Sequence, residues 1–265
     1  MRFKTYIQMK LFNSIKRDEN PENLRTKILQ DQFLHENYLY LIDRLVNQLD
    51  IYDTSDCYVL ELGSAGGITD LHKSFVKTSD VRTCTGVNLN LDACKLELDS
   101  DSIDGIFAKD VLHHLPDIEK HFNELTRVLK KGASASFIEP NWNWISRIIY
   151  FWFHPEPWIV NSQEVKKLSI ETHASMANPM FSNQALPYIK FRKQINCFEK
   201  DFPSLKVTIN EIPLNGLSFI ISGGAFKRNK ISSRFLLKLK KWEEKRKYWM
   251  IIFGVSRLIT IRKVY

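Results

Sequence analysis

Two acidic residues and a glycine turn lie at the ends of two strand-like segments. Glu61 stands near the end of the apolar run 58–62, which breaks into the turn Gly63-Ser64-Ala65-Gly66-Gly67, and Asp80 closes a second run nineteen residues after Glu61. Glycine lets the backbone approach a ligand closely, and a carboxylate can accept both hydroxyls of a ribose. A strand, a glycine turn, a helix and a second strand ending in a carboxylate form the front half of a nucleoside-binding unit. These residues predict an adenosine-type cofactor.

The order of the glycines separates two classes of nucleotide. Dinucleotide folds use G-x-G-x-x-G to hold a pyrophosphate at a helix N-terminus, and this turn lacks that spacing. Residues 61–67 instead resemble motif I of class I S-adenosylmethionine-dependent methyltransferases, E/D-x-G-x-G-x-G, with Ala65 in place of the middle glycine. The likeness covers roughly residues 24–140, and three later segments carry it in the family's order: Asp92-Ala93, Val111 to Leu115, and Arg127 to Gly132.

The resemblance implies a set of cofactor contacts. Glu61 lies where the family organises the cofactor's amino group, Asp80 would bind the ribose, and Asp92 would accept from the adenine amino group. Asn88 or Asn90 could serve in place of Asp80, and Asp92 could have only a turn or capping role. The residues expected to bind S-adenosyl-L-methionine are Glu61, Gly63, Ser64, Ala65, Gly66, Asp80, Asp92, Ala93 and Asp110.

Histidines are the candidates for proton transfer. His113 and His114 follow the fourth expected strand, at the edge where a parallel sheet presents side chains to a ligand. With an ordinary pKa of about 6.5, a histidine there could take a proton from a hydroxyl acceptor, or it could only shape the cofactor pocket. His154 with Glu156 is the alternative base. No third ligand has a recognisable metal-site spacing, so we expect no metal.

An aromatic segment follows the fifth expected strand, and it contains Trp142, Trp144, Tyr150, Phe151, Trp152, Phe153 and Trp158. Aromatic faces stack on sugar rings and bury lipid-like surface, so we expect this segment to cover the methyl acceptor. Packing of the segment onto the sheet is the alternative. Short pieces at 153–158, 183–187 and 222–224 are similar to the branch of the family associated with surface-polysaccharide pathways.

Alternating strands and helices predict the fold class. The apolar pattern predicts a helix at 21–49, two late strands that complete a sheet, and five earlier strands near 57–62, 74–79, 87–91, 104–108 and 133–139. The resemblance implies that the last strand is antiparallel. We therefore expect an α/β, Rossmann-like, seven-stranded and mostly parallel sheet with helices on both faces and an aromatic insertion after the fifth strand.

The composition fits one soluble domain. Of the 265 residues, 44% are apolar and 26% are charged, and the four cysteines show no metal-ligand spacing and are expected to be reduced. The N-terminus lacks the apolar core of a secretory signal, and no run reaches the ~18 apolar residues of a membrane span, so we expect a cytoplasmic protein. The expected parts are a cofactor core at about 24–140, an acceptor-covering insertion at about 141–187 and a C-terminal region at 188–265.

Positive charge is concentrated in the C-terminal region. Residues 226–265 carry thirteen Lys and Arg against two Glu, although the whole chain is only +8. Phe235, Leu239, Trp242, Trp249 and Phe253 recur at helical spacing and predict an amphipathic helix. Its basic face could be a solvated surface, or it could meet an acidic substrate or the anionic lipids of the inner membrane face. A nucleic-acid partner is not expected because no RNA-binding motif is present, and the sequence leaves the oligomeric state open.

Together these patterns predict an S-adenosylmethionine-dependent methyltransferase that methylates a hydroxyl of a small-molecule, glycan or lipid-linked acceptor. The alternative is a cofactor-binding but catalytically silent partner or scaffold protein, because Ala65 alters the glycine motif and no general base is assured.

Overall fold

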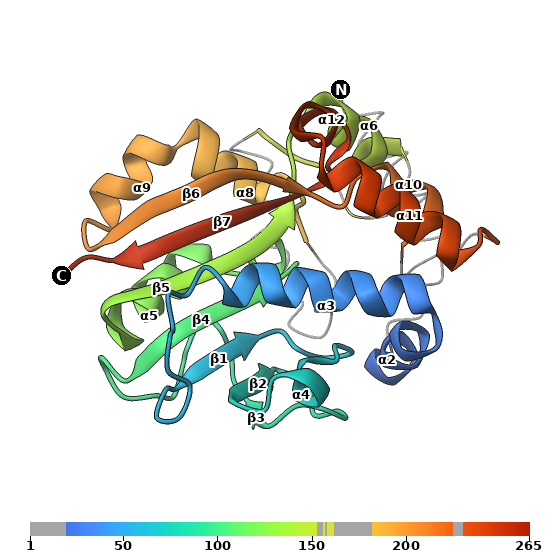
Figure 1. Cartoon of the computed structure of the whole chain (residues 1–265). Helices are drawn as coiled ribbons and strands as arrows, with labels where there is room; N and C mark the ends of the chain where they lie inside the picture. The colour runs from blue at the N-terminus through green and yellow to red at the C-terminus, as the bar shows by residue number, and fades with distance from the viewer. Residues whose placement is uncertain (1–19, 153–155, 157, 162–181, 225–229) are drawn as a thin grey trace.

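A computed structural model of the chain describes residues 20–152, 156, 158–161, 182–224 and 230–265. Its seven strands form one sheet in the order β3-β2-β1-β4-β5-β7-β6 (Figure 1). The strands β1 to β5 run parallel to one another, and β7 is antiparallel to both β5 and β6. The predicted fold class is confirmed, including the antiparallel last strand. The strand bounds are β1 Val59–Leu62, β2 Val76–Asp80, β3 Leu89–Asn90, β4 Ile103–Lys109, β5 Leu129–Pro140, β6 Leu205–Leu214 and β7 Ser256–Lys263.

The pleat of the inner strands divides the core between two faces. Leu60 and Leu62 of β1 lie in one buried cluster with Ile106 of β4, whereas Val59 and Phe107 lie in another. Alternate residues of a strand point to opposite faces, so both faces need a helical cover. The helix α3 (Gln32–Val46) covers the face of Val59 and Phe107, and α5 (Ile118–Val128) covers the other (Figure 1).

The prediction of one long helix at 21–49 is wrong, because this segment forms two helices, α2 and α3. The helix α2 (Pro21–Gln30) ends at Asp31, whose backbone is extended, with φ −100° and ψ 111°. The Asp31 carboxylate accepts from the backbone N–H of Leu34 at 3.0 Å and so caps α3. The chain can therefore turn at Asp31, which lets α2 pack beside the glycine turn.

The remaining helices follow the strands and the late part of the chain. A single turn, α4, follows β1, and a 3₁₀ turn, η1, follows β4. Within the described residues, no helix is both long and apolar enough to cross a bilayer. These elements are α4 Thr69–His72, η1 Leu112–His114, α6 Trp144–Trp152, α8 Leu186–Tyr188, the π-helical η2 Ile189–Lys193, α9 Ile195–Asp201, α10 Leu217–Ser222, α11 Ser233–Glu244 and α12 Lys247–Phe253.

The prediction of one C-terminal amphipathic helix is also corrected. The segment forms two helices, α11 and α12, and α11 buries a different stripe of side chains from the one predicted. Phe235 and Trp242, which the pattern predicts to face the core, are 53% and 41% exposed. Leu236 packs instead against α3. Glu243 is buried too, and its carboxylate accepts from the backbone N–H of Ser218 at 3.2 Å. The break falls at Arg246, whose backbone is non-helical, with φ −124° and ψ 87°.

Candidate functional site

The glycine turn is held against the end of β2. Gly63 and Gly66 have φ of +68° and +78°, values that glycine adopts without strain. A Cβ at Gly63 would come within 2.4 Å of the Val111 side chain, so a larger residue would displace the segment after β4. The N–H of Ser64 donates to the Ser79 carbonyl at 2.9 Å, and the N–H of Ala65 donates to Asp80 Oδ2 at 3.1 Å. The turn predicted to hold a nucleoside is therefore ordered by β2.

Glu61 is a buried carboxylate, and one of its two oxygens has no hydrogen-bond partner among the described residues. Its Oε1 accepts from the Thr69 hydroxyl at 3.0 Å, whereas its Oε2 is buried and has no hydrogen-bond partner in the described part of the chain. Burial raises the pKa of Glu61 to about 8. An unpaired buried carboxylate oxygen is costly, and a ligand that brings an ammonium group would pair it. This oxygen fits the amino group of S-adenosylmethionine.

Asp80 lies at the predicted ribose position and is already engaged. Its Oδ1 accepts from the backbone N–H of Arg82 at 2.9 Å and from Arg82 Nε at 3.1 Å, and its Oδ2 accepts from Ala65. Ribose hydroxyls would have to use the remaining lone pairs or displace the Arg82 guanidinium. The two residues named above as alternatives to Asp80 already contact β2. Asn88 Oδ1 accepts from the Thr78 N–H at 3.0 Å, and Asn90 Nδ2 lies 3.4 Å from the Asp80 carbonyl.

Asp92 and Ala93 form a turn beyond β3. Asp92 is exposed, and its Oδ1 accepts from the Cys94 N–H at 2.8 Å, which is the turn role named above as its alternative. The Ala93 carbonyl lies 2.8 Å from His121 Nδ1. Neither contact tests binding to adenine, so the adenine role of both residues stays a prediction.

Asp110 occupies a left-handed position after β4, with φ +56°. Its carboxylate forms an ion pair with Lys109, and its N–H donates to the Ile138 carbonyl at 2.8 Å. Burial would raise the pKa of Asp110, but Lys109 and then His113 hold it below its usual value. The carboxylate therefore stays charged between the glycine turn and the histidines.

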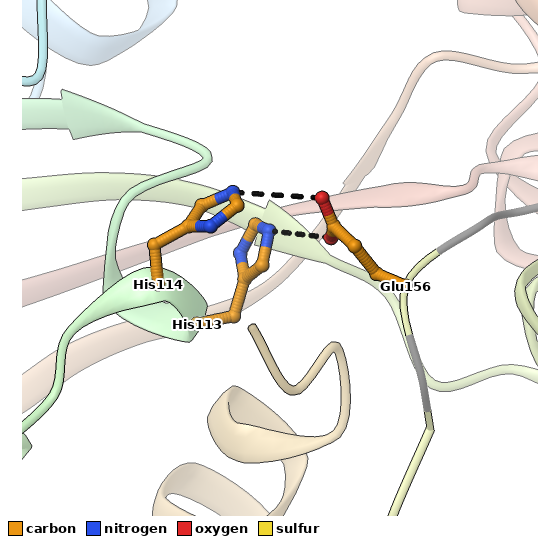
Figure 2. Close-up of side chains that lie close together, drawn as sticks. All are labelled: His113, His114 and Glu156. Carbon is orange, nitrogen blue, oxygen red and sulfur yellow. Dashed lines mark ion pairs between the residues drawn. The ribbon is translucent and has the colours of Figure 1, made fainter. Parts of the chain in front are cut away.

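Two histidines and a glutamate converge beyond the ends of β4 and β5. His113 and His114 come from η1, and both rings point toward the carboxylate of Glu156 (Figure 2). His113 Nε2 lies 3.4 Å from Glu156 Oε2, and His114 Nε2 lies 3.7 Å from Glu156 Oε1. His113 and Glu156 are buried, whereas the His114 side chain keeps 25% of its surface exposed. His114 is thus the more accessible of the two histidines.

Glu139, at the end of β5, orients this cluster. Its Oε1 accepts from the backbone N–H groups of Val111 and Leu112 at 2.9 and 2.7 Å, and its Oε2 lies 2.6 Å from His113 Nδ1. Burial alone would lower the pKa of His113, but Glu139 and Glu156 raise it to about 10. His113 is therefore an imidazolium at neutral pH, and an imidazolium cannot accept a proton.

The segment that begins at Ser182 closes the cluster. The N–H of Asn183 donates to the His113 carbonyl at 3.0 Å, and the Asn183 side chain bonds both backbone groups of Ile159. The Gln184 amide nitrogen contacts Glu156 and lies 3.1 Å from His113 Nε2. The amide nitrogen can donate to Glu156, but it makes no hydrogen bond with His113 Nε2 when that ring is protonated, because both nitrogens then carry hydrogens.

The same three groups could hold a metal ion. The ligand atoms of His113, His114 and Glu156 all lie within 4.8 Å of one another, and Glu139 behind His113 resembles the carboxylate that often supports a metal-bound histidine. The spacing of residues in the sequence gave no third ligand, and the fold supplies Glu156. The Gln184 amide nitrogen contacts Glu156, so a metal ion would have to share this carboxylate with an amide donor.

Other predicted contacts fall partly outside the described residues. His154 and Phe153 lie outside them, so their predicted contact with an acceptor stays a prediction. Tyr150 and Trp158 stack with their ring centroids 6.0 Å apart, and the Trp142 ring lies 5.9 Å from that of Tyr188. These rings pack on one another, whereas Trp144 is 64% exposed.

The residues of the matched segment support the enzyme class. Residues 60–137, from β1 to β5, match the protein-family model described as "Methyltransferase domain". This match covers less than half of the chain, and it contains the glycine turn, Asp80 and both histidines of the cluster. The predicted methyltransferase class is confirmed. A search of curated proteins finds no match to the chain.

Solved structures with a similar fold include several methyltransferases. Geranyl diphosphate C-methyltransferase from Streptomyces coelicolor A3(2) shares 11% identity, with 88% of this chain and 82% of that chain covered and a TM-score of 0.48. A SAM-dependent methyltransferase from Archaeoglobus fulgidus shares 17% identity, with 89% and 98% covered and a TM-score of 0.45. Phosphoethanolamine N-methyltransferase 2 from Haemonchus contortus shares 14%, with 87% and 53% covered and a TM-score of 0.42. Such remote likenesses carry no argument about the acceptor.

Proposed function

We propose that this protein is an S-adenosylmethionine-dependent methyltransferase that methylates a hydroxyl group of a small-molecule, glycan or lipid-linked acceptor. The observation that carries the proposal is the buried Oε2 of Glu61, which has no partner among the described residues and lies within the methyltransferase domain, directly before the glycine turn. When bound, S-adenosylmethionine supplies an electrophilic methyl group on a sulfonium.

The donor side of the site is made by β1 and β2. Glu61 pairs with the amino group, the turn from Gly63 to Gly66 lies along the methionine part, and Asp80 takes the ribose hydroxyls. These contacts orient the reactants, and orientation alone can supply roughly 7–11 kcal/mol of the barrier without a covalent intermediate. Little further chemistry is required of the protein.

The acceptor side is made by the histidine cluster. His113 carries a proton already and is fixed by Glu139, so it acts as a positioning residue. His114 is partly exposed, and Glu156 lies 3.7 Å from its Nε2, where its charge would stabilise a protonated ring. We assign His114 as the base that takes the hydroxyl proton, a role worth typically 10²–10⁴-fold in rate. The aromatic rings of Tyr150 and Trp158 beside Glu156 suit a sugar or lipid acceptor of the kind found in surface-polysaccharide pathways.

The test is transfer of a labelled methyl group from S-adenosylmethionine to small-molecule and lipid extracts. His114→Asn should lower the transfer rate about 10²-fold or more while the affinity for S-adenosylhomocysteine stays unchanged. His35→Asn, on α3 outside the cluster, is the matched control and should retain the rate. Full transfer by His114→Asn would show that His114 is not the base. Loss of cofactor affinity in this variant would place His114 on the donor side. Wild-type protein that binds the cofactor but transfers nothing to any extract would favour the silent scaffold.

A further inference from the structure

Three helices beyond the carboxyl end of β5 expose apolar side chains. On α6, Trp144 and Ile148 are one helical turn apart and are 64% and 44% exposed. On α12, Tyr248 is 83% exposed, and Ile251 and Ile252, which lie one turn further, are 46% and 42% exposed. Residues three and four positions apart lie on one face of a helix, so each helix presents an apolar stripe to solvent.

The helices are joined into one end of the molecule. The Asn143 side chain, just before α6, donates to the carbonyls of Ile251 and Gly254 at 3.0 and 2.8 Å. Trp242 of α11 contacts Trp249 of α12, with ring centroids 5.3 Å apart. Figure 1 shows α6, α11 and α12 grouped together at the upper right, where β5 ends. We call the exposed side chains of these three helices, and of the turn between α11 and α12, the basic aromatic face.

The charge of this face has one sign. Its seven exposed charged side chains, among them Arg147, Lys241, Lys245 and Lys247, are all Lys or Arg. The two acidic residues of α11 are withdrawn, because Glu243 is buried against Ser218 and Glu244 forms an ion pair with Lys240. No exposed carboxylate among the described residues of these helices offsets the positive field.

We propose that the basic aromatic face binds the surface of an anionic lipid bilayer. Trp and Tyr favour the headgroup region, isoleucines enter the acyl boundary, and Lys and Arg meet anionic headgroups. Nucleic acid would use the basic residues but not the exposed isoleucines of α6 and α12, so lipid fits the whole set. The binding is in-plane, since no described helix is able to span a membrane.

This surface lies next to the histidine cluster. Glu139, which fixes His113, is followed after one residue by Asn141, and the Asn141 side chain donates to the carbonyl of Gly254, the residue after α12, at 2.7 Å. A bilayer on this face would therefore lie close to the acceptor side of the site. Lipid binding does not require methyl transfer, so the two proposals can fail separately.

The test is sedimentation of the full chain with vesicles of phosphatidylcholine containing about 30% phosphatidylserine, against pure phosphatidylcholine. We expect binding to the anionic vesicles only, and binding that weakens as salt increases. Lys241→Glu with Lys245→Glu should weaken the vesicle affinity at least tenfold, since each basic residue near the surface contributes roughly fivefold. Lys131→Glu with Lys206→Glu, two exposed residues at the other end of the sheet, changes the net charge equally and should change affinity far less.

A second pair of variants tests the apolar part. Tyr248→Ser with Ile252→Ser should weaken vesicle binding roughly tenfold, whereas Tyr52→Ser, which alters a 96% exposed tyrosine elsewhere, should not. Failure of the wild type to bind, or an equal loss in the Lys131 and Lys206 control, would overturn the proposal. So would tight binding of a single-stranded oligonucleotide that the Tyr248 and Ile252 variant leaves unchanged, because the face would then be a site for nucleic acid. S-adenosylhomocysteine affinity measured on the same proteins reports separately on the cofactor site.

Discussion

Cofactor binding should release a proton from Glu61. The pKa of this buried carboxyl is about 8, so at pH 7 roughly nine molecules in ten carry it protonated. An ammonium group that pairs with the free Oε2 requires the ionised form. Ionising the group one pH unit below its pKa costs about 1.4 kcal/mol, which is a tenfold loss of apparent affinity. The affinity for S-adenosylhomocysteine should therefore rise about tenfold for each pH unit up to 8 and then level off.

The substitution Glu61→Gln separates this effect from the titration of the ligand. A charge-assisted hydrogen bond contributes about 1.5–3 kcal/mol, so above pH 8 the variant should bind roughly 10- to 150-fold more weakly than the wild type. At pH 7 the ionisation cost of about 1.4 kcal/mol offsets much of that difference and leaves roughly a 15-fold loss or less. The pH dependence due to Glu61 should be absent from the variant.

Calorimetric titration with S-adenosylhomocysteine between pH 6 and about 8.5, in two buffers of different ionisation enthalpy, measures both the affinity and the protons released. Glu97→Gln, which alters an exposed glutamate that pairs with Lys95, is the control and should behave as the wild type. If wild-type and Glu61→Gln proteins have the same pH slope and release the same number of protons, Glu61 does not meet the amino group. The assignment of the donor side would then be wrong.

Three further predictions concern the ribose carboxylate, the histidine cluster and its charge. Asp80→Asn should weaken S-adenosylhomocysteine binding about 10- to 150-fold by calorimetry, and an unchanged dissociation constant in the folded variant would move the ribose site elsewhere. Dialysis against EDTA should leave methyl transfer intact, because the proposed reaction uses His114 as a base and needs no metal; a loss restored by zinc or magnesium would instead reveal a metal on His113, His114 and Glu156. The folded pKa of His113, about 10, lies above its ordinary 6.5, so its contribution to stability is complete below about pH 6.5 and is lost as the pH rises to about 10. His113→Gln should therefore show a smaller fall in melting temperature across that range, and an equal fall in both proteins would show that His113 is not charged in the folded state.

The sheet and the glycine turn after β1 were predictable because their signals are local. A strand, a glycine turn and a following carboxylate occur within twenty residues, and the turn needs glycine at Gly63 and Gly66 for reasons of backbone geometry. The engagement of Asp80 by Arg82 was not predictable, since the pairing depends on the short loop after β2. The resemblance predicts a ribose role for Asp80, but it does not predict the contacts that Asp80 makes with Ala65 and Arg82.

The acceptor side could only be predicted in part, since its residues are far apart in the sequence. His113 and His114 were candidates from their place after β4, and Glu156 was named only as a partner of His154. Glu139 was missed as a site residue, although a carboxylate at the carboxyl end of a central parallel strand is a signal that could have identified it. Gln184 reaches the cluster because Asn183 bonds the backbone of His113, a contact across seventy residues that no spacing rule reports.

The prediction of which face of α11 is buried was wrong for a related reason. Helical periodicity favours the aromatic stripe of Phe235 and Trp242, but the buried stripe is chosen by what α11 packs against. Ser218 offers a hydrogen bond to Glu243, and the apolar cluster at the start of α3 accepts Leu236. The displaced aromatics remain on the surface, where they form part of the basic aromatic face.

The most direct test of the central claim is calorimetric titration of the wild-type protein with S-adenosylhomocysteine and, in parallel, with NAD. The buried Glu61 oxygen and the glycine spacing predict binding of S-adenosylhomocysteine with a dissociation constant on the order of micromolar and no binding of NAD. Binding of NAD without any heat from S-adenosylhomocysteine would contradict the assignment of this protein as an S-adenosylmethionine-dependent methyltransferase.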